Sequence, residues 1–200
     1  MSILTWPARL IPKSQQFYPV FTTRQFKSPF TGAAQTMEYP ACAWHCQLTF
    51  KDLDRDELRA LETFLIQLRG AAGRFRIGDQ ANGEPRGLAV GSPVVDGGNQ
   101  TGSALTISGC QPLQNFLLAG DYITVNNELK RLTFDATANA EGKTVLRFEP
   151  NLRNSPANGA GIIVRDTYAI MRLADDKQGK AKRVPLFGNA TLNLVEDIYT

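Results

Sequence analysis

Hydrophobic and polar residues alternate along residues 42–50. A period of two residues is typical of a strand that buries one face. We therefore expect a half-buried strand whose apolar face, cysteines included, packs in a core while His45 points the other way. The residues of this apolar face are Cys42, Trp44, Cys46, Leu48 and Phe50.

The pattern changes to a helical period directly after this strand. Asp54 can cap the helix, with Glu57 three residues later in capping-box position. Gly70 is a natural stop signal. The sequence thus predicts one amphipathic helix of about four turns, which must lie on a sheet. Its apolar stripe consists of Leu58, Leu61, Phe64, Leu65 and Leu68.

Residues 74–77 alternate again and predict a short strand. From Gln80 to about Asp166, glycines and turn residues are dense and the apolar runs are short. Asn126 and Asn127 can take the positive φ values of a tight hairpin, with a loop of two or three residues. Several short strands in succession favour a small barrel. The candidate strands are 88–90, 104–107, 122–125, 129–134, 144–148 and 162–164.

The first forty residues are rich in proline, so strands there should be short or lie at sheet edges. Residues 22–36 predict an extended arm or a long loop. Phe26 and Phe30 lie near Arg24 and Lys27 in this segment. Exposed aromatic and basic residues suit a docking surface; the alternative is that both phenylalanines pack in the protein's own core.

Two further strands are predicted near the end of the chain, at 168–173 and 190–195, on either side of a polar loop, 175–183. We expect these strands to return to the first part of the chain and complete its sheet. The sequence therefore predicts a mainly β fold with one helix. Its expected domains are 1–80 together with 167–200, and an insert at 81–166.

Composition and charge exclude little. The 200 residues carry a net charge of +3, and residues 81–166 contain 7 Lys and Arg against 8 Asp and Glu. A nucleic-acid-binding surface usually shows a concentrated basic stripe. Arg74 and Arg76 are basic residues on either side of the aromatic Phe75, an arrangement found on single-strand-binding surfaces. We nevertheless expect no specific nucleic-acid binding. No apolar run approaches a membrane span, and the N-terminus lacks signal-peptide features.

The candidate metal sites are weak. Cys42, His45 and Cys46 suggest zinc, but alternation along the strand turns His45 away from the cysteines, and Cys110 belongs to another segment. The acids of 52–56 resemble the opening of a calcium loop, but they fit the first turn of a helix better. We expect neither a metal nor a cofactor.

Candidate catalytic residues are equally weak. His45 is the single histidine and has no evident nucleophile partner. Carboxylates for glycoside cleavage are present, but their spacing selects no pair. We therefore expect a protein that is not an enzyme. The carboxylates considered are Asp121, Asp135, Glu141 and Glu149.

The order of segments resembles a known family. The helix at 54–70 runs into Gly73-Arg-Phe-Arg-Ile-Gly-Asp79, and a Gly/Ser-rich insert follows, with Leu118-Ala-Gly-Asp-Tyr-Ile123 and Phe148-Glu-Pro-Asn-Leu-Arg153. This succession resembles distal tail proteins, and related minor tail proteins, of long-tailed non-contractile bacteriophages. The resemblance covers most of the chain but contains no catalytic motif.

The resemblance implies a tail-tube-like β-sandwich with a flanking helix and an inserted oligonucleotide-binding-type barrel. It implies a homo-hexameric ring at the tail tip that joins the tail tube protein to the hub or baseplate protein and lines the DNA channel. Such a protein is made in the host bacterial cytoplasm and ends in the virion. The expected subunit or partner contacts are Arg24, Phe26, Phe30, Lys177, Lys180, Lys182 and Arg183.

An alternative function is host recognition through a saccharide bound by the barrel. Tyr122 and Phe134 could stack on a sugar ring if they are exposed. The competing expectation is that both lie in the barrel core.

Overall fold

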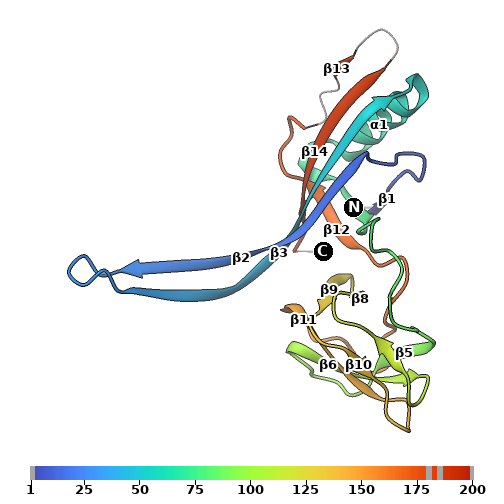
Figure 1. Ribbon diagram of the computed structural model, residues 1–200. Coiled ribbons are helices and arrows are strands. Elements are labelled where there is room, and N and C mark those ends of the chain that lie inside the picture. The colour runs from blue at the N-terminus through green and yellow to red at the C-terminus, as the bar shows by residue number, and fades with distance from the viewer. Residues whose placement is uncertain (1–2, 179–181, 184–186, 199–200) are drawn as a thin grey trace.

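The computed structural model describes residues 3–178, 182–183 and 187–198. It is mainly β with a single α-helix in the described chain, which confirms the predicted fold class (Figure 1). The helices are α1 (Arg55–Leu68) and the short 3₁₀ turn η1 (Gly70–Ala72). The strands are β1 (Ile3–Thr5), β2 (Ser14–Lys27), β3 (Ala34–Leu53), β4 (Arg74–Ile77), β5 (Gly91–Val95), β6 (Gly102–Cys110), β7 (Asn115–Leu117), β8 (Tyr122–Val125), β9 (Glu128–Leu132), β10 (Ala136–Thr137), β11 (Thr144–Leu152), β12 (Ala169–Leu173), β13 (Lys182–Arg183) and β14 (Gly188–Glu196).

The larger sheet has seven strands in the order β1-β4-β12-β14-β3-β2, with β13 paired to β14. Only β1 and β4 run parallel; the other pairs are antiparallel. β12 and β14 lie between β4 and β3, so the C-terminal strands do complete this sheet, as predicted. They occupy its middle, which ties the two ends of the chain together.

Helix α1 forms as its capping signals predict. Asp54 Oδ1 accepts a hydrogen bond from the Glu57 amide (2.7 Å), and Glu57 Oε2 accepts one from the Asp54 amide (2.9 Å). Leu61, Phe64 and Leu68 are buried, while Leu58 and Leu65 pack at the edge of the same core. The last helical residue is Leu68, and the C-cap is Arg69 in the left-handed conformation (φ 52°), directly before the predicted stop signal Gly70.

The core of the larger sheet lies between the sheet and α1 and is rich in aromatic rings. Trp6 packs against Phe50, Phe64 and Phe75 at centroid distances of 5.2–6.1 Å. The predicted face of β3 is buried here, with Trp44, Cys46, Leu48 and Phe50 almost fully inaccessible. The alternation read from the sequence therefore identified the core-facing side correctly.

The second sheet has the order β5-β6-β11-β9-β8. The segment 159–163 joins its two edges. Ile163 exchanges backbone hydrogen bonds with Thr124 of β8, and Val95 of β5 donates to Ala160. These bonds close the sheet into a small barrel around its own hydrophobic cluster.

The β8–β9 hairpin has a two-residue loop, since Val125 pairs directly with Glu128. Asn126 and Asn127 between them have φ values of 50° and 63°. Both are in the left-handed region, as a tight primed turn requires. The open question of two or three residues is thus resolved as two.

Some predicted strands of the insert differ from those observed. Residues 88–90 precede the strand, which begins at Gly91 and contains Pro93 next to a register shift. Residues 162–164 form isolated bridges rather than a strand. The position of β5 was predicted wrongly because Pro93 and the register shift break the period of two residues that identifies a strand.

Two hydrophobic clusters divide the protein. One belongs to the larger sheet and the other to the barrel, and their residues fall on either side of the predicted boundaries with two exceptions. Tyr122 and Leu129, from β8 and β9, lie in the cluster of the larger sheet. The exact boundaries at 80/81 and 166/167 remain a prediction.

Candidate functional site

The feature that stands out is a two-stranded arm. Beyond Phe21 on β2 and Cys42 on β3, the two strands leave the sheet as a hairpin (Figure 1). Residues 22–27 pair with 39–34 in antiparallel register. Six residues of strand correspond to about 20 Å of reach. The extended arm predicted for residues 22–36 is therefore confirmed, and it is a hairpin instead of a loop.

The arm begins at an irregularity in the ladder. Phe21 pairs with Cys42, whereas the next residue, Thr22, pairs with Tyr39. Two additional residues of β3, Pro40 and Ala41, are accommodated there. Bulges bend a strand and increase its twist, so this irregularity lies where the arm turns away from the sheet. Pro40 lacks an amide donor and is tolerated at such a position.

The register gives the arm two different faces, because residues opposite each other on paired strands share a face. One face carries the apolar residues Tyr18, Val20, Phe26, Met37 and Tyr39, together with Thr22, Arg24 and Gln35. The opposite face beyond the bulge carries Thr23, Gln25, Lys27, Thr36 and Glu38. The arm is therefore amphipathic, although nothing in the described chain covers it.

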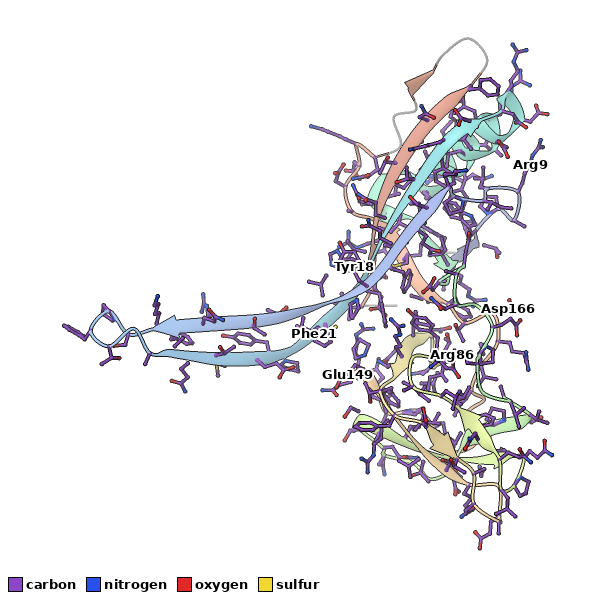
Figure 2. All side chains as sticks on the ribbon, viewed as in Figure 1. Arg9, Tyr18, Phe21, Arg86, Glu149 and Asp166 are labelled. Carbon is purple, nitrogen blue, oxygen red and sulfur yellow. The ribbon has the colours of Figure 1, made fainter. Side chains whose placement is uncertain are left out.

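The apolar face is open to solvent. Phe26 and Met37 are each 53% exposed, and Tyr18 is 46% exposed. Figure 2 shows the side chains of the arm projecting with no other element packed over them. An exposed apolar surface rimmed by polar residues marks an interaction site.

Both edges of the arm are also open within the described chain. β2 pairs with β3 alone, and β14 pairs with β3 only from Val195–His45 down to Gly188–Leu53. Residues 34–41 of β3 therefore present unpaired backbone groups. An open strand edge is a template for pairing with another strand, and an isolated two-stranded hairpin is marginally stable in water. The arm has the properties of a segment that is completed by a partner.

The tip of the arm is ordered by its own hydrogen bonds. Ser28 Oγ accepts from the amides of Phe30 and Thr31 (both 3.3 Å), and the Ser28 amide donates to the Ala33 carbonyl (2.8 Å). Gly32 completes the turn with φ +71°. This turn holds Phe30 outward with 96% of its surface exposed. Below it, a hollow of about 420 Å³ is lined by Phe26, Lys27, Ser28, Ala33, Ala34 and Gln35.

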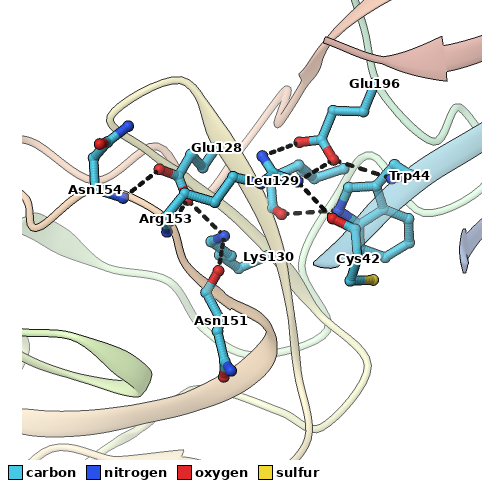
Figure 3. Close-up of polar contacts among 9 residues, drawn as sticks. All are labelled: Cys42, Trp44, Glu128, Leu129, Lys130, Asn151, Arg153, Asn154 and Glu196. Carbon is cyan, nitrogen blue, oxygen red and sulfur yellow. Dashed lines mark hydrogen bonds and ion pairs between the residues drawn. The ribbon is translucent and has the colours of Figure 1, made fainter. Parts of the chain in front are cut away.

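A polar cluster joins the root of the arm to the barrel (Figure 3). Arg153, which follows β11, binds both oxygens of Glu196 on β14, with Nη1–Oε1 2.9 Å and Nη2–Oε2 2.5 Å. Its Nη2 also donates to the Cys42 carbonyl at 3.0 Å. The Trp44 amide donates to Glu196 Oε2 at 3.0 Å, so barrel, arm root and β14 meet at these side chains.

The barrel side of the cluster contains a second ion pair. Glu128 accepts from Lys130 Nζ (2.7 Å) and from the amides of Arg153 (3.0 Å) and Asn154 (3.1 Å). Lys130 has no exposed surface and also donates to the Asn151 carbonyl at 2.7 Å. Burial lowers the pKa of Lys130 from its ordinary value, while its bond to Glu128 acts in the opposite direction. Each buried charge thus has a partner, as burial requires.

The predicted contact residues are divided between two regions. Arg24 and Phe26 lie on the apolar face of the arm and Phe30 at its tip, so these three are brought together. Lys177 is exposed in the turn after β12, where its amide donates to Asp175 (2.6 Å). Lys182 and Arg183 form β13, which pairs with β14 at the far end of the sheet from the arm (Figure 1). Lys180 lies outside the described residues.

Sequence reasoning missed Tyr18, Val20, Met37 and Tyr39 of the arm. The signal was weak, because Met37 and Tyr39 alternate with Glu38 on the β3 side of the tip, whereas four polar residues separate Phe21 from Phe26 on the β2 side. Pro19 and Pro40 interrupt that pattern and suggested short strands. Proline is compatible with β2 because it is an edge strand.

Neither aromatic residue considered for saccharide stacking lies in the core of the barrel. Tyr122 is 3% exposed and belongs to the cluster of the larger sheet. Phe134 was expected in the barrel core and is instead 59% exposed, with the Arg147 guanidinium 5.7 Å from its ring centroid. The strand β9 ends at Leu132, before Phe134, and this is why its ring is not directed inward.

The described residues contain no group of three or more His, Cys, Asp or Glu side chains placed to hold a metal ion. They also contain no helix that is long and apolar enough to cross a membrane. His45 stacks on Tyr18 with a centroid distance of 6.0 Å, away from Cys42 and Cys46.

Comparison with known proteins adds no relative. No protein family model matches the chain, and no curated protein matches its sequence significantly. The fold and the arm define a class, a mainly β protein with a small barrel and a projecting amphipathic hairpin.

Proposed function

We propose that this protein is a structural subunit that assembles with copies of itself into a ring, at the distal end of a bacteriophage tail. The observation that supports this proposal is the arm, with two open edges and an uncovered apolar face. A long hairpin that no other part of the described chain covers is suited to assembly with a partner. The tail-tip location comes from the resemblance to distal tail proteins.

The arm suits head-to-tail contacts. Its two open edges belong to different strands, β2 and β3, so one edge of a copy can meet the other edge of the next. Such heterologous contacts produce a closed ring when the rotation between copies closes. Each contact would pair backbone groups that water otherwise solvates and would cover the apolar face of the arm.

The proposed partners follow from this location. One face of the ring meets the tail tube protein, and the other meets the hub or baseplate protein of the tip. The lumen conducts DNA without holding it, which suits a protein with a net charge of +3, since strong phosphate binding would slow passage. The polar turn with Lys177 and the far end of the sheet with Lys182 and Arg183 are proposed as contacts with these neighbours.

The first experiment measures the mass of the full chain by light scattering over a range of concentrations, with negative-stain imaging. Six copies of the 22.0 kDa chain would give about 132 kDa. A chain that stays monomeric at every concentration, both alone and when mixed with the tube and hub proteins of its own phage, would overturn the proposal.

The arm itself is tested with two matched double variants. Val20→Lys with Phe26→Lys places two charges on the apolar face, whereas Thr23→Lys with Gln25→Lys places the same two charges on the polar face. We expect the first pair to abolish assembly and the second to retain it. Equal effects of the two pairs would show that the apolar face is not the contact.

The saccharide alternative has lost support. Tyr122 is covered and its hydroxyl donates to Asp79 (3.2 Å), so it is not available to stack on a sugar ring. Phe134 remains exposed, but a single ring without convergent polar groups is a weak basis for sugar recognition. Glycan-array binding by the full chain, lost on Phe134→Ala, would restore this alternative.

A further inference from the structure

The edge of β3 that faces β14 has an unusual sequence of partners. From Leu53 to His45 this edge pairs with β14. At Trp44 the strand partner is replaced by a side chain, since the Trp44 amide donates to the Glu196 carboxylate. Two residues further on, the Cys42 carbonyl accepts from Arg153 of the barrel. The open edge, residues 34–41, begins directly beyond.

The barrel therefore supplies the last partner of this edge before the arm begins. Arg153 and Glu196 take the place of a strand over the stretch from Trp44 to Cys42. Their bidentate pair has a fixed planar geometry, and Glu196 is 2% exposed. The position of the barrel is thus transmitted to the residue from which the arm departs.

The ionic character of this contact supports a positioning role. Desolvating two charges offsets most of their attraction, so a buried ion pair adds little stability beyond what an apolar contact would give. The Arg153–Glu196 pair does impose one geometry, because moving either side chain away leaves the other charge buried without a partner. The Trp44 indole adds a second directional contact, donating from Nε1 to the Leu129 carbonyl of β9 at 2.9 Å.

Other charged groups between the barrel and the arm oppose close approach. Glu149 of β11 points out of the barrel, and its pKa is raised by burial first and by the nearby Glu38 of the arm second. Figure 2 shows Glu149 on the barrel next to the start of the arm. Two carboxylates of like charge resist folding of the arm onto the barrel, while Arg153 prevents the root from separating.

We propose that the barrel sets the direction of the arm, with Arg153 as the positioning residue, so that barrel and arm move as one lever. The coupling acts within a single copy and does not depend on the proposed ring. A displacement of the barrel, whatever binds it, changes the angle at which the arm meets its partner.

The test measures distances between spin labels at Gln25→Cys on the arm and Val145→Cys on the barrel, both exposed positions. The three native cysteines are buried and are left in place. Labelled full-length chain is diluted into an excess of unlabelled chain, so that only distances within one copy are recorded. We expect a single narrow distance distribution.

Arg153→Met removes the guanidinium while keeping an unbranched side chain. We expect the distance distribution to broaden and hydrogen exchange at the amides of residues 41–44 to accelerate by roughly tenfold or more, as the loss of a charged hydrogen bond implies. Arg165→Met is the matched control, because Arg165 forms an exposed ion pair with Glu84 on the same barrel. It should change neither quantity.

Arg153→Lys keeps the charge but not the bidentate geometry. It should broaden the distribution less than Arg153→Met does, and it serves as the test should Arg153→Met fail to fold. An unchanged distance distribution in a folded Arg153 variant, judged by near-ultraviolet circular dichroism, would overturn the proposal. So would equal broadening in Arg165→Met.

Discussion

The ring of Tyr122, from the barrel, meets the indole of Trp44, from the larger sheet, edge to face, with centroids 5.7 Å apart and planes at 62°. Phe17 of β2 completes this contact, at 5.2 Å from Trp44 and 6.4 Å from Tyr122. A residue of the barrel is thus a core residue of the sheet. The barrel and the larger sheet are therefore joined by buried apolar contacts in addition to their polar cluster, and such contacts couple the unfolding of the two parts.

We predict that the chain unfolds in one cooperative transition, because the larger core is incomplete without Tyr122. Tyr122→Ala should lower the free energy of unfolding by about 3–5 kcal/mol, as for other buried aromatic residues, and should separate the unfolding of the barrel from that of the sheet. Scanning calorimetry measures both effects. Phe134→Ala, at an exposed ring of the same barrel, is the control. Two transitions in the wild type would contradict the prediction.

The buried pair of Lys130 and Glu128 predicts a strong coupling. Lys130→Met alone leaves the Glu128 carboxylate without its cation and should cost about 3–5 kcal/mol. Glu128 keeps two backbone donors, so the double variant with Glu128→Gln should recover part of this loss. Urea unfolding of the two single variants and the double variant gives the coupling energy. Additive losses would show that the two charges do not depend on each other.

The raised pKa of Glu149 predicts a dependence of stability on pH. The Glu149 carboxyl loses its proton less readily in the folded protein than in the unfolded chain. The folded state is therefore favoured while this carboxyl is protonated, and the free energy of unfolding falls as the pH rises through the raised pKa. Glu149→Gln should therefore be more stable than the wild type at pH 7, by less than about 1 kcal/mol because the group is partly solvated. The difference should shrink as the pH falls towards 4.5, the ordinary value.

Urea unfolding at several pH values measures this difference. Glu141→Gln, an exposed position on the same barrel, is the control and should show no comparable gain. Glu38→Gln should lower the pKa of Glu149 towards the ordinary value and reduce the benefit of Glu149→Gln. A difference that grows on acidification would mean that the sign is wrong.

The cysteines should be unreactive in the native protein. Burial raises the pKa of Cys46 to about 12 and that of Cys110 to about 11, and it raises the pKa of Cys42 as well. Since the thiolate is the reactive form, a chromogenic disulfide reagent at pH 8 should label none of them. All three should react in guanidinium, and an added Val145→Cys should react at once. Rapid labelling of a native thiol would contradict the described burial.

The helix cap gives a local prediction. Asp54→Ala removes the carboxylate that accepts from the Glu57 amide but keeps the residue-54 amide that donates to Glu57, and it should cost about 1 kcal/mol. Asp56→Ala changes an acid in the same first turn that makes only exposed ion pairs and should cost less. Thermal unfolding compares the two. Equal losses would assign the effect to charge at the helix end instead of capping.

The sequence by itself determined the elements whose signals are local. The face of β3, the capped helix, the paired asparagines of the β8–β9 turn and the mainly β class with one helix all follow from periods and caps within a few residues. It also indicated an extended arm or long loop with Arg24, Phe26 and Phe30, but it left open whether the two phenylalanines pack in a core, and the structure shows both exposed. These features depend on backbone propensity and on which side of one element is apolar, and residues close together in the sequence determine both.

The tertiary structure alone decided the relationships between distant segments. The amphipathic character of the arm requires the pairing of residues 22–27 with 34–39, and a proline on each side of the tip obscured that pairing. The contacts of Glu196 join it to Arg153, 43 residues away, and to Trp44, 152 residues away. No local sequence pattern predicts contacts over such separations. Tyr122 was expected in the barrel and lies in the other core, because burial is determined by what packs against a strand from outside it. The shared core is a property of such packing, and it is the fold that brings its residues together.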